Sequence, residues 1–171
     1  GQDGSYLAEL LLEKKYRVHG IVRKDFKENN SKYFWRIKNI YKKIRLHKLD
    51  IANYNQLKKI IKKIKPNEVY HLAAQAHDGH SFNEEFYTFE INLNFTHKIL
   101  SIVKKVNKNA KFFFAGSSEM YSKNILKKID EDTNFNPRSA YGIAKVASHF
   151  LVKSYRETFN FNASTGILFN H

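Results

Sequence analysis

The feature that most limits the fold of this chain is a regular alternation of short apolar runs with longer segments of helical periodicity. The runs do not alternate apolar and polar residues with a period of two, as strands with one solvated face would. Short apolar strands separated by helices are typical of a parallel sheet covered on both faces, so we predict an α/β, doubly wound parallel sheet. The predicted strands are 17–23, 45–49, 68–73, 111–117 and 162–169, and the predicted helices are 1–15, 34–41, 54–64, 84–106 and 139–159.

The composition is that of a globular protein, because 42% of the residues are hydrophobic and 15% are aromatic. There is no cysteine. Its absence excludes disulfides, thiolate metal sites and cysteine nucleophiles, and it fits a reducing, cytoplasmic compartment. No stretch approaches the ~18 apolar residues that a membrane-spanning helix needs, so we predict no membrane partner.

The chain is strongly basic, with a formal net charge of +14. One interpretation is an anionic partner, either a nucleic acid or a phosphorylated small molecule. The other is lysine used as a solubilising residue, and the scatter of lysines over the predicted outer helix faces favours it. Because the sequence holds no recognisable nucleic-acid module, we predict no nucleic-acid partner. A basic, non-catalytic binding protein stays an alternative, and a steep loss of affinity with salt would support it.

Two sequence features suit a dinucleotide that carries several phosphates. Gly1, Gln2, Asp3 and Gly4 head the first predicted helix, and glycines there let the backbone approach a pyrophosphate at the helix N-terminus. In such a fold, the strand after the glycine-headed helix usually ends on an acidic residue that binds the ribose of NAD. Arg23 and Lys24 stand there instead. Two cations favour a 2′-phosphate, so we predict NADP rather than NAD.

Candidate catalytic residues occur in two places. Tyr141 and Lys145 lie at i and i+4 on one face of a predicted helix. A free Tyr has a pKa of roughly 10, and we expect the Lys145 ammonium to lower the pKa of Tyr141 enough for it to act as a base. Ser117 and Glu119 follow the fourth predicted strand, at the sheet edge where ligands bind. Their hydroxyl and carboxylate suit holding a substrate oxygen and moving a proton.

Five blocks of the sequence together resemble the GDP-mannose 4,6-dehydratase family, which belongs to the extended short-chain dehydrogenases/reductases. The blocks are GQDGSYLAELLLEKKYRVHGIVR, HLAAQAHDGHSF, GSSEMY, NPRSAYGIAK and GILFNH. The resemblance implies a Rossmann-like fold, NADP as cofactor, GDP-mannose as substrate and a homo-oligomeric full-length protein. A dehydratase acting on a GDP-heptose, or an epimerase or reductase acting on another nucleotide sugar, stays open.

The resemblance also implies a role for individual residues. In the catalytic site, Tyr141 is the base, Lys145 its helper and a cofactor ligand, Ser117 a sugar-binding hydroxyl and Glu119 the acid/base. The implied cofactor-binding residues are Gly1, Gln2, Asp3, Gly4 and Ser5 for the pyrophosphate, Arg23 and Lys24 for the 2′-phosphate, Asp50 and Ile51 for the adenine, Leu72, Ala73, Ala74 and Gln75 for the ribose and nicotinamide, and Tyr87 and His171. Ser117 and Asn170 are the implied substrate ligands.

The implied reaction has three steps and loses one water. Tyr141 takes the proton of the sugar 4-hydroxyl while hydride leaves C4 for NADP. Glu119 then removes the C5 proton and water leaves C6, after which the same hydride returns to C6. Elimination needs an acid/base at C5, whereas 4-epimerisation does not, so Glu119 favours the dehydratase.

The sequence departs from the family pattern at several positions. Ser117 stands where many members have Thr, and Phe95 replaces a usual Gly in the long predicted helix, where we expect disturbed packing. Residues 24–37 lack the family's Ser-rich stretch, and Asp78 replaces an apolar residue. His71, His77 and His80 could suggest a metal site, but their spacing matches no known site, so we predict none.

The chain starts on its glycine turn and stops directly after a predicted strand. A doubly wound sheet normally opens with a strand that leads into this turn. We therefore expect one domain, residues 1–171, truncated at the N-terminal strand and lacking a C-terminal substrate lobe. Loss of a central strand exposes the edges of its neighbours, so we expect the isolated 171 residues to be poorly stable and inactive.

Overall fold

The computed structural model describes residues 1–27, 34–51, 53–75, 82–121 and 128–169. The chain forms two compact units, Gly1–Ile60 and Ile61–His171, here called unit 1 and unit 2. Each is described by itself. Among the described residues, no helix combines the length and the apolar character needed to span a membrane.

Unit 1 is built around two parallel strands. Its elements are α1 (Gln2–Glu13), β1 (His19–Arg23), the 3₁₀ helices η1 (Phe34–Ile37) and η2 (Tyr41–Lys43), β2 (Arg45–Leu49) and the start of α2 (Tyr54–Ile64). In the β1–β2 ladder, His19 faces Arg45 and Arg23 faces Leu49. The helix predicted at 34–41 forms two short 3₁₀ turns instead of one α-helix.

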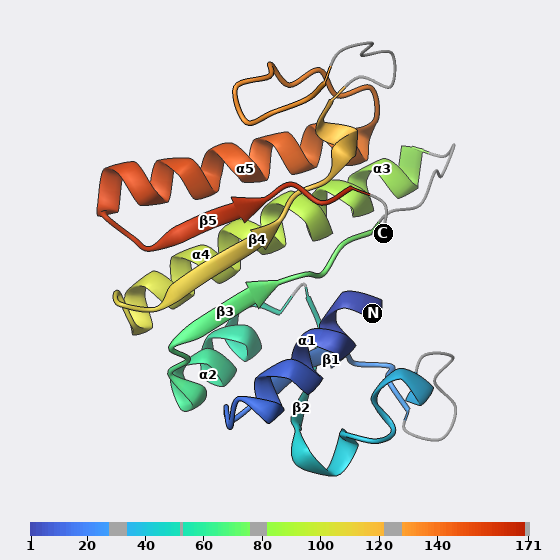
Figure 1. Cartoon of the computed structure of the whole chain (residues 1–171), viewed down its shortest axis with the longest axis vertical. Coiled ribbons are helices and arrows are strands. Elements are labelled where there is room, and N and C mark those ends of the chain that lie inside the picture. Colours follow the sequence, from blue (N-terminus) through green and yellow to red (C-terminus); the bar gives the residue numbers. More distant parts are fainter. Residues whose placement is uncertain (28–33, 52, 76–81, 122–127, 170–171) are drawn as a thin grey trace. The chain divides into compact units, whose positions relative to one another are not determined.

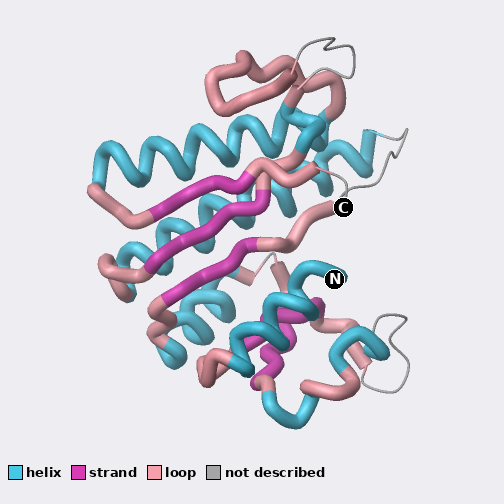
Figure 2. Tube along the Cα trace, viewed as in Figure 1, coloured by secondary structure: helices cyan, strands magenta, loops and turns pink. Residues whose placement is uncertain are grey.

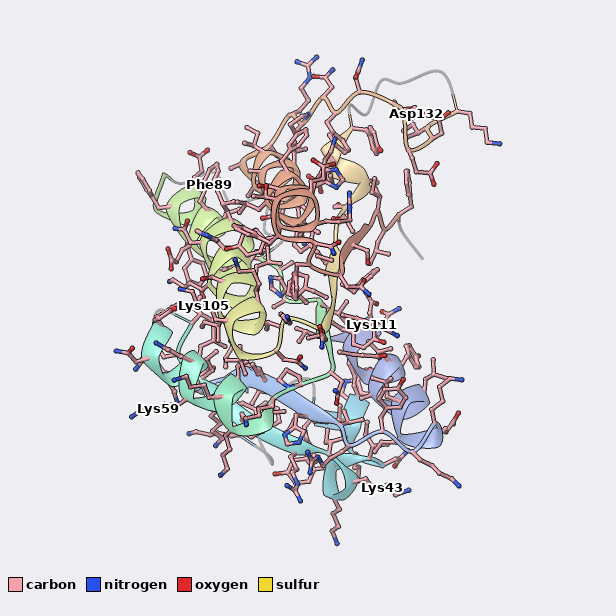
Figure 3. The ribbon with its side chains drawn as sticks, turned by 90° about the vertical axis from the view of Figure 1, so that its left-hand side faces the viewer. Lys43, Lys59, Phe89, Lys105, Lys111 and Asp132 are labelled. Atoms are coloured by element: carbon pink, nitrogen blue, oxygen red, sulfur yellow. The ribbon has the colours of Figure 1, made fainter. Side chains whose placement is uncertain are left out.

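The helix α2 illustrates how the sequence sets an element's bounds. The side chain of Asn53 accepts a hydrogen bond from the Gln56 backbone N–H at 2.9 Å, which satisfies one of the unpaired amides of the first turn. Leu57 and Ile61 lie one turn apart and are buried, whereas the exposed Lys59 points outward (Figure 3). Pro66 follows the helix, as predicted, because it cannot continue it.

Unit 2 contains a parallel sheet of three strands in the order β3–β4–β5. The strands are β3 (Glu68–His71), β4 (Lys111–Ala115) and β5 (Ala163–Gly166). The helices are α3 (Phe82–Phe89), a π-helical turn η3 (Glu90–Asn94), α4 (Phe95–Val106), the 3₁₀ turn η4 (Ser118–Met120) and α5 (Ala140–Phe159). Figures 1 and 2 show α4 and α5 running along the strands, and Figure 3 shows both on the same face of the sheet.

The core of unit 2 lies between this sheet and these helices. Phe112 and Phe114 of β4 are at most 1% exposed, and Leu100, Val103 and Val152 are completely buried. The helical periodicity at 84–106 predicts five inward-facing residues, Ile91, Ile99, Ile102, Val103 and Val106. The first four are buried and Val106 is half-buried. The α/β class with parallel strands and the order of the elements are therefore as predicted, while most strands are shorter than their apolar runs.

Candidate functional site

The carboxyl end of β4 leads directly into the candidate catalytic residues. After Ala115 come Gly116 and Ser117, and the η4 turn that begins at Ser118 carries Glu119. A Cβ on Gly116 would lie 3.1 Å from the Gly166 carbonyl oxygen and 3.1 Å from the Met120 sulfur. Glycine thus lets the end of β4 stay close to the end of β5 and to η4.

Ser117 organises the η4 turn. Its backbone is extended, and its Oγ accepts a hydrogen bond from the Glu119 N–H at 3.2 Å. The Ser117 side chain also interacts with the Tyr141 phenol and favours its ionised form. One hydroxyl therefore connects the η4 turn with the candidate base on α5.

The first turn of α5 lies against η4. A Cβ on Gly142 would overlap the Glu119 carbonyl oxygen and lie 3.1 Å from the Cβ of Pro137. The helix begins at the N-cap residue Ser139, whose Oγ accepts from the Gly142 N–H at 3.0 Å and donates to Glu119 Oε2 at 3.0 Å. The glycine of the YGIAK sequence is thus required for the close approach of Glu119 to α5.

The Tyr141 phenol is partly buried, and its pKa is raised. Burial is the main cause and the negative charge of Glu119 adds to it, while the hydrogen bond with Ser117 acts in the opposite direction. This result corrects our expectation of a lowered pKa. Burial disfavours the charged phenolate more strongly than the neighbouring Ser117 favours it.

Lys145 is only 2% exposed, one turn after Tyr141. Its Nζ donates to the Ala115 carbonyl at 2.6 Å and lies 4.7 Å from the centroid of the Phe114 ring and 5.5 Å from that of Tyr141. Burial lowers the pKa of Lys145 to about 8. The Lys145 amine is therefore mostly protonated at neutral pH, and it lies one helical turn from the candidate base Tyr141.

The π-helical turn η3 carries Asn92, a residue that sequence reasoning missed. The fully buried Asn92 side chain accepts from the Gln75 N–H at 3.2 Å and donates to the Gln75 carbonyl at 3.1 Å and the Thr88 carbonyl at 3.0 Å. The Asn92 carbonyl accepts from Ser148 Oγ on α5 at 2.6 Å. Asn92 thus ties the segment after β3 to the helix that carries Tyr141. The sequence signal that could have identified Asn92 is its position as a polar residue among the apolar, inward-facing residues of the predicted helix.

The other unit 2 residues predicted to bind cofactor follow β3 or lie on α3. Leu72 and Gln75 are half-buried, Ala73 and Ala74 are exposed, and Tyr87 on α3 is 42% exposed. Asn170 and His171 lie outside the described residues. Phe95, where the family usually has Gly, is buried and packs its ring edge-on against His71 at 5.7 Å, so it is accommodated in the core.

His71 is a core residue of β3. Its Nε2 lies 2.9 Å from Thr96 Oγ1, whose own proton goes to the Asn92 carbonyl, so Nε2 carries the histidine proton. Burial first, and then the charge of Lys145, lower the pKa of His71 to about 3. His77, His80 and Asp78 lie outside the described residues, within which no group of three or more potential metal ligands occurs.

Unit 1 carries the residues predicted to bind the cofactor phosphates. Gly1 is the N-cap of α1, Gln2, Asp3 and Gly4 form its first turn, and Ser5 Oγ donates to the Gln2 carbonyl at 2.6 Å. Two exposed ion pairs lie at the end of β1. Arg23 Nη2 is 3.3 Å from Asp25 Oδ2, and Lys24 Nζ is 2.7 Å from Asp50 Oδ2. Asp50 and Ile51 directly follow β2.

A third cation of unit 1 was not foreseen. Arg36 stacks on Trp35, with its guanidinium carbon 4.6 Å from the ring centroid, and its buried Nε has no hydrogen-bond partner in the described part of the chain. Arg36 lies on η1, which packs against α1, so this guanidinium belongs to the part of unit 1 that holds the glycine-headed helix. Helix N–H groups and nearby cations are the donors that a dinucleotide pyrophosphate needs, so these residues fit such a cofactor.

Solved structures of nucleotide-sugar enzymes share the fold of this chain. A UDP-Glc/GlcNAc 4-epimerase from Campylobacter jejuni matches with a TM-score of 0.81 and 16% identity, over 97% of this chain and 49% of that one. A dTDP-glucose 4,6-dehydratase from Bacillus anthracis, solved in complex with NAD, matches with a TM-score of 0.75 and 19% identity, over 97% of this chain and 50% of that one. The fold is thus that of the Rossmann-type epimerases and dehydratases.

Sequence comparison defines the family. The family model described as GDP-mannose 4,6 dehydratase matches residues 1–171. The GDP-mannose 4,6 dehydratases of Homo sapiens and Drosophila melanogaster are 42% and 41% identical over the whole of this chain, which covers 48% and 45% of their lengths. The chain belongs to the GDP-mannose 4,6-dehydratase family, and it spans about half the length of the curated relatives it matches.

Proposed function

We propose that this chain is the cofactor-binding and catalytic part of a nucleotide-sugar 4,6-dehydratase that converts GDP-mannose to GDP-4-keto-6-deoxymannose. The observation that carries the proposal is the convergence of four side chains in unit 2. Ser117 and Glu119 follow β4, and Tyr141 and Lys145 lie on the first two turns of α5. A hydroxyl, a carboxylate, a phenol and a buried ammonium are the groups that proton transfer at C4 and C5 of a sugar requires.

In this proposal Tyr141 accepts the proton of the sugar 4-hydroxyl. Ser117, whose side chain interacts with the phenol, positions the sugar oxygen beside it. Bound NADP supplies a reversible hydride acceptor, and the positive charge of its oxidised nicotinamide favours the phenolate that burial disfavours. Lys145, whose Nζ lies 5.5 Å from the centroid of the Tyr141 ring, adds a second positive charge near the phenol.

Glu119 acts once C4 is a ketone. The ketone acidifies the C5 hydrogen, Glu119 removes that proton, and the electron pair forms the C5–C6 double bond as the C6 oxygen leaves. Glu119 returns the proton to that oxygen, which departs as water. When bound, NADP would return the hydride to C6, and the proton that Tyr141 took from the 4-hydroxyl balances the one that C5 gains, so the net change is the loss of one water with the cofactor unchanged.

NADP is the proposed cofactor rather than NAD. No acidic residue follows β1 directly, where NAD enzymes bind the ribose 2′-hydroxyl, and Arg23 and Lys24 stand there instead. Their ion pairs with Asp25 and Asp50 are exposed, so water already screens them and a 2′-phosphate can compete for both cations.

The test incubates the full-length protein that carries this chain with GDP-mannose and NADP. Mass spectrometry should show loss of one water without net reduction of the cofactor. Glu119→Gln should abolish the product, because the amide cannot take the C5 proton. Glu157→Gln on the exposed end of α5 is the matched control and should keep full activity.

Other outcomes separate the alternatives. Dehydration of a GDP-heptose but not of GDP-mannose would keep the mechanism and change the substrate. Epimerisation or reduction without loss of water, unaffected by Glu119→Gln, would contradict the dehydratase. The inactivity of the isolated 171 residues stays a prediction, which is why the assay uses the full-length protein.

A further inference from the structure

The hydroxyl of Ser139 joins the head of α5 to the candidate acid/base. Its Oγ lies 3.0 Å from the Gly142 backbone nitrogen and 3.0 Å from Glu119 Oε2. Ser139 was not among the site residues predicted from the sequence. It precedes Tyr141 by two residues, and its side chain is partly buried between η4 and α5.

The direction of both hydrogen bonds follows from the number of protons available. A serine hydroxyl has one proton to donate and two lone pairs to accept with. The Gly142 N–H donates to Oγ and occupies one lone pair. The single hydroxyl proton is therefore directed at Glu119, whose ionised carboxylate can only accept.

The backbone of Glu119 is fixed at both its N–H and its carbonyl group. Ser117 Oγ accepts from its backbone N–H, and its carbonyl lies against Gly142, where no side chain would fit. Without Ser139, the carboxylate would be the one part of Glu119 left to rotate about its side-chain torsions. A single hydrogen bond occupies only part of the acceptor capacity of a carboxylate, so Glu119 can still receive a proton from substrate.

We infer that Ser139 is a positioning residue that orients the carboxylate of Glu119 for proton transfer at C5 of the sugar. The inference rests on the proposed function, in which Glu119 is the acid/base. Catalytic groups must be held close to their productive geometry, and a displacement of 1 Å can cost about 100-fold in rate. The alternative role is that of a helix cap alone, because serine is a favoured N-cap residue.

Three substitutions separate the two roles. Ser139→Gly removes the hydroxyl, and glycine at an N-cap costs the helix little. Ser139→Asp keeps an acceptor for the Gly142 N–H but offers no proton to Glu119 at neutral pH. Ser139→Thr keeps the cap and the hydroxyl proton together. Thermal unfolding followed by circular dichroism establishes that each variant is folded.

The experiment uses the full-length protein with GDP-mannose and NADP and follows two steps. Nicotinamide absorbance in a single turnover reports oxidation at C4, and mass spectrometry reports the loss of water. For Ser139→Gly and Ser139→Asp we expect C4 oxidation at the wild-type rate, dehydration slowed about 10- to 100-fold with KM little changed, and transient accumulation of reduced cofactor. Ser139→Thr should restore dehydration to within about threefold of wild type.

Each contrary result has a separate meaning. Wild-type dehydration by both Ser139→Gly and Ser139→Asp would show that Ser139 is only a cap and overturn the inference. Equal slowing of oxidation and dehydration would also overturn it, because the effect would then pass through Tyr141. A wild-type protein that dehydrates no nucleotide sugar would overturn the proposed function and this inference with it.

Discussion

Unit 1 and unit 2 differ in how much apolar surface they bury. Among the described residues, the buried apolar side chains of unit 1 are Ile40, Leu49 and Leu57, whereas unit 2 has seventeen. No residue of β1 is buried, and its Ile21 is 44% exposed, while Phe114 of β4 is completely buried.

The difference matches the chemistry proposed for each unit. Proton transfer at C4 and C5 needs side chains held in fixed positions, which a dense core provides. Binding of phosphates relies on helix N–H groups and flexible cations, which tolerate a thinner support. We therefore expect substitutions in unit 2 to affect stability and catalysis, and substitutions in unit 1 to affect mainly the cofactor.

The largest expected contrast is between Phe114→Ala and Ile21→Ala. Loss of a fully buried aromatic ring should cost about 3–5 kcal/mol of unfolding free energy. Loss of the half-exposed Ile21 should cost less than about 1 kcal/mol. Urea unfolding of the 171-residue chain, to which these exposures belong, measures both, and equal costs would contradict the difference between the units.

Acid should weaken unit 2 through His71. Its pKa in the folded protein is lowered to about 3, so the unfolded state binds more protons between pH 3 and 6.5. Above about pH 6.5, His71 is neutral in both states and does not lower the free energy of unfolding. As the pH falls toward 3, only the unfolded state is protonated, so the free energy of unfolding should fall by on the order of a few kcal/mol.

His71→Gln keeps a donor for Thr96 and removes the titration, so it should flatten the dependence of stability on pH over this range. His19→Gln in unit 1 is the comparison, since burial first and then His47, Arg17 and Arg45 lower the pKa of His19 in the same direction. An unchanged pH slope in His71→Gln would show that this histidine is not the cause.

Gly142→Ala should have the next largest effect on the free energy of unfolding. The added Cβ overlaps the Glu119 carbonyl, so η4 or α5 must shift, at a cost of about 1–3 kcal/mol. Dehydration should fall together with stability, because Glu119 moves away from α5. Gly20→Ala in unit 1 adds a Cβ 2.8 Å from Leu46 Cδ2, the end of a flexible side chain that can move, and should cost less than about 1 kcal/mol. Wild-type dehydration by Gly142→Ala would contradict the geometry of the site.

The smallest expected effect on stability is that of Lys24→Ala, because this side chain is exposed and its ion pair with Asp50 is solvated. We expect an unchanged melting temperature. NADP binding, measured by calorimetry, should weaken about tenfold while NAD binding stays the same, because one charge contact to the 2′-phosphate is lost. Equal weakening of NAD and NADP would contradict a 2′-phosphate contact.

The sequence predicted the elements and candidate residues whose signals are local. Tyr141 and Lys145 are one helical turn apart, and Glu119 follows an apolar strand, so their combined pattern and the family resemblance selected them as candidates. Asn92 and Ser139 act through partners brought close only by the fold, Gln75 in one case and Glu119 in the other. These contacts were therefore missed.

The wrong prediction of a lowered pKa for Tyr141 has the same origin. The spacing of Tyr141 and Lys145 indicated their proximity but not their burial, and burial sets the direction of the pKa shift for both. In unit 1, the position of Arg36 on a turn that packs against α1 depends on how residues 34–37 fold, which periodicity does not reveal.

The measurement that most directly tests the proposed dehydratase is the fate of the hydrogen on C4. The full-length protein is incubated with unlabelled NADP and GDP-mannose carrying deuterium at C4, and the product is analysed by mass spectrometry and NMR. Internal hydride transfer predicts a dehydrated product with the deuterium at C6. Deuterium found in the nicotinamide, or a product that carries none at C6, would contradict it.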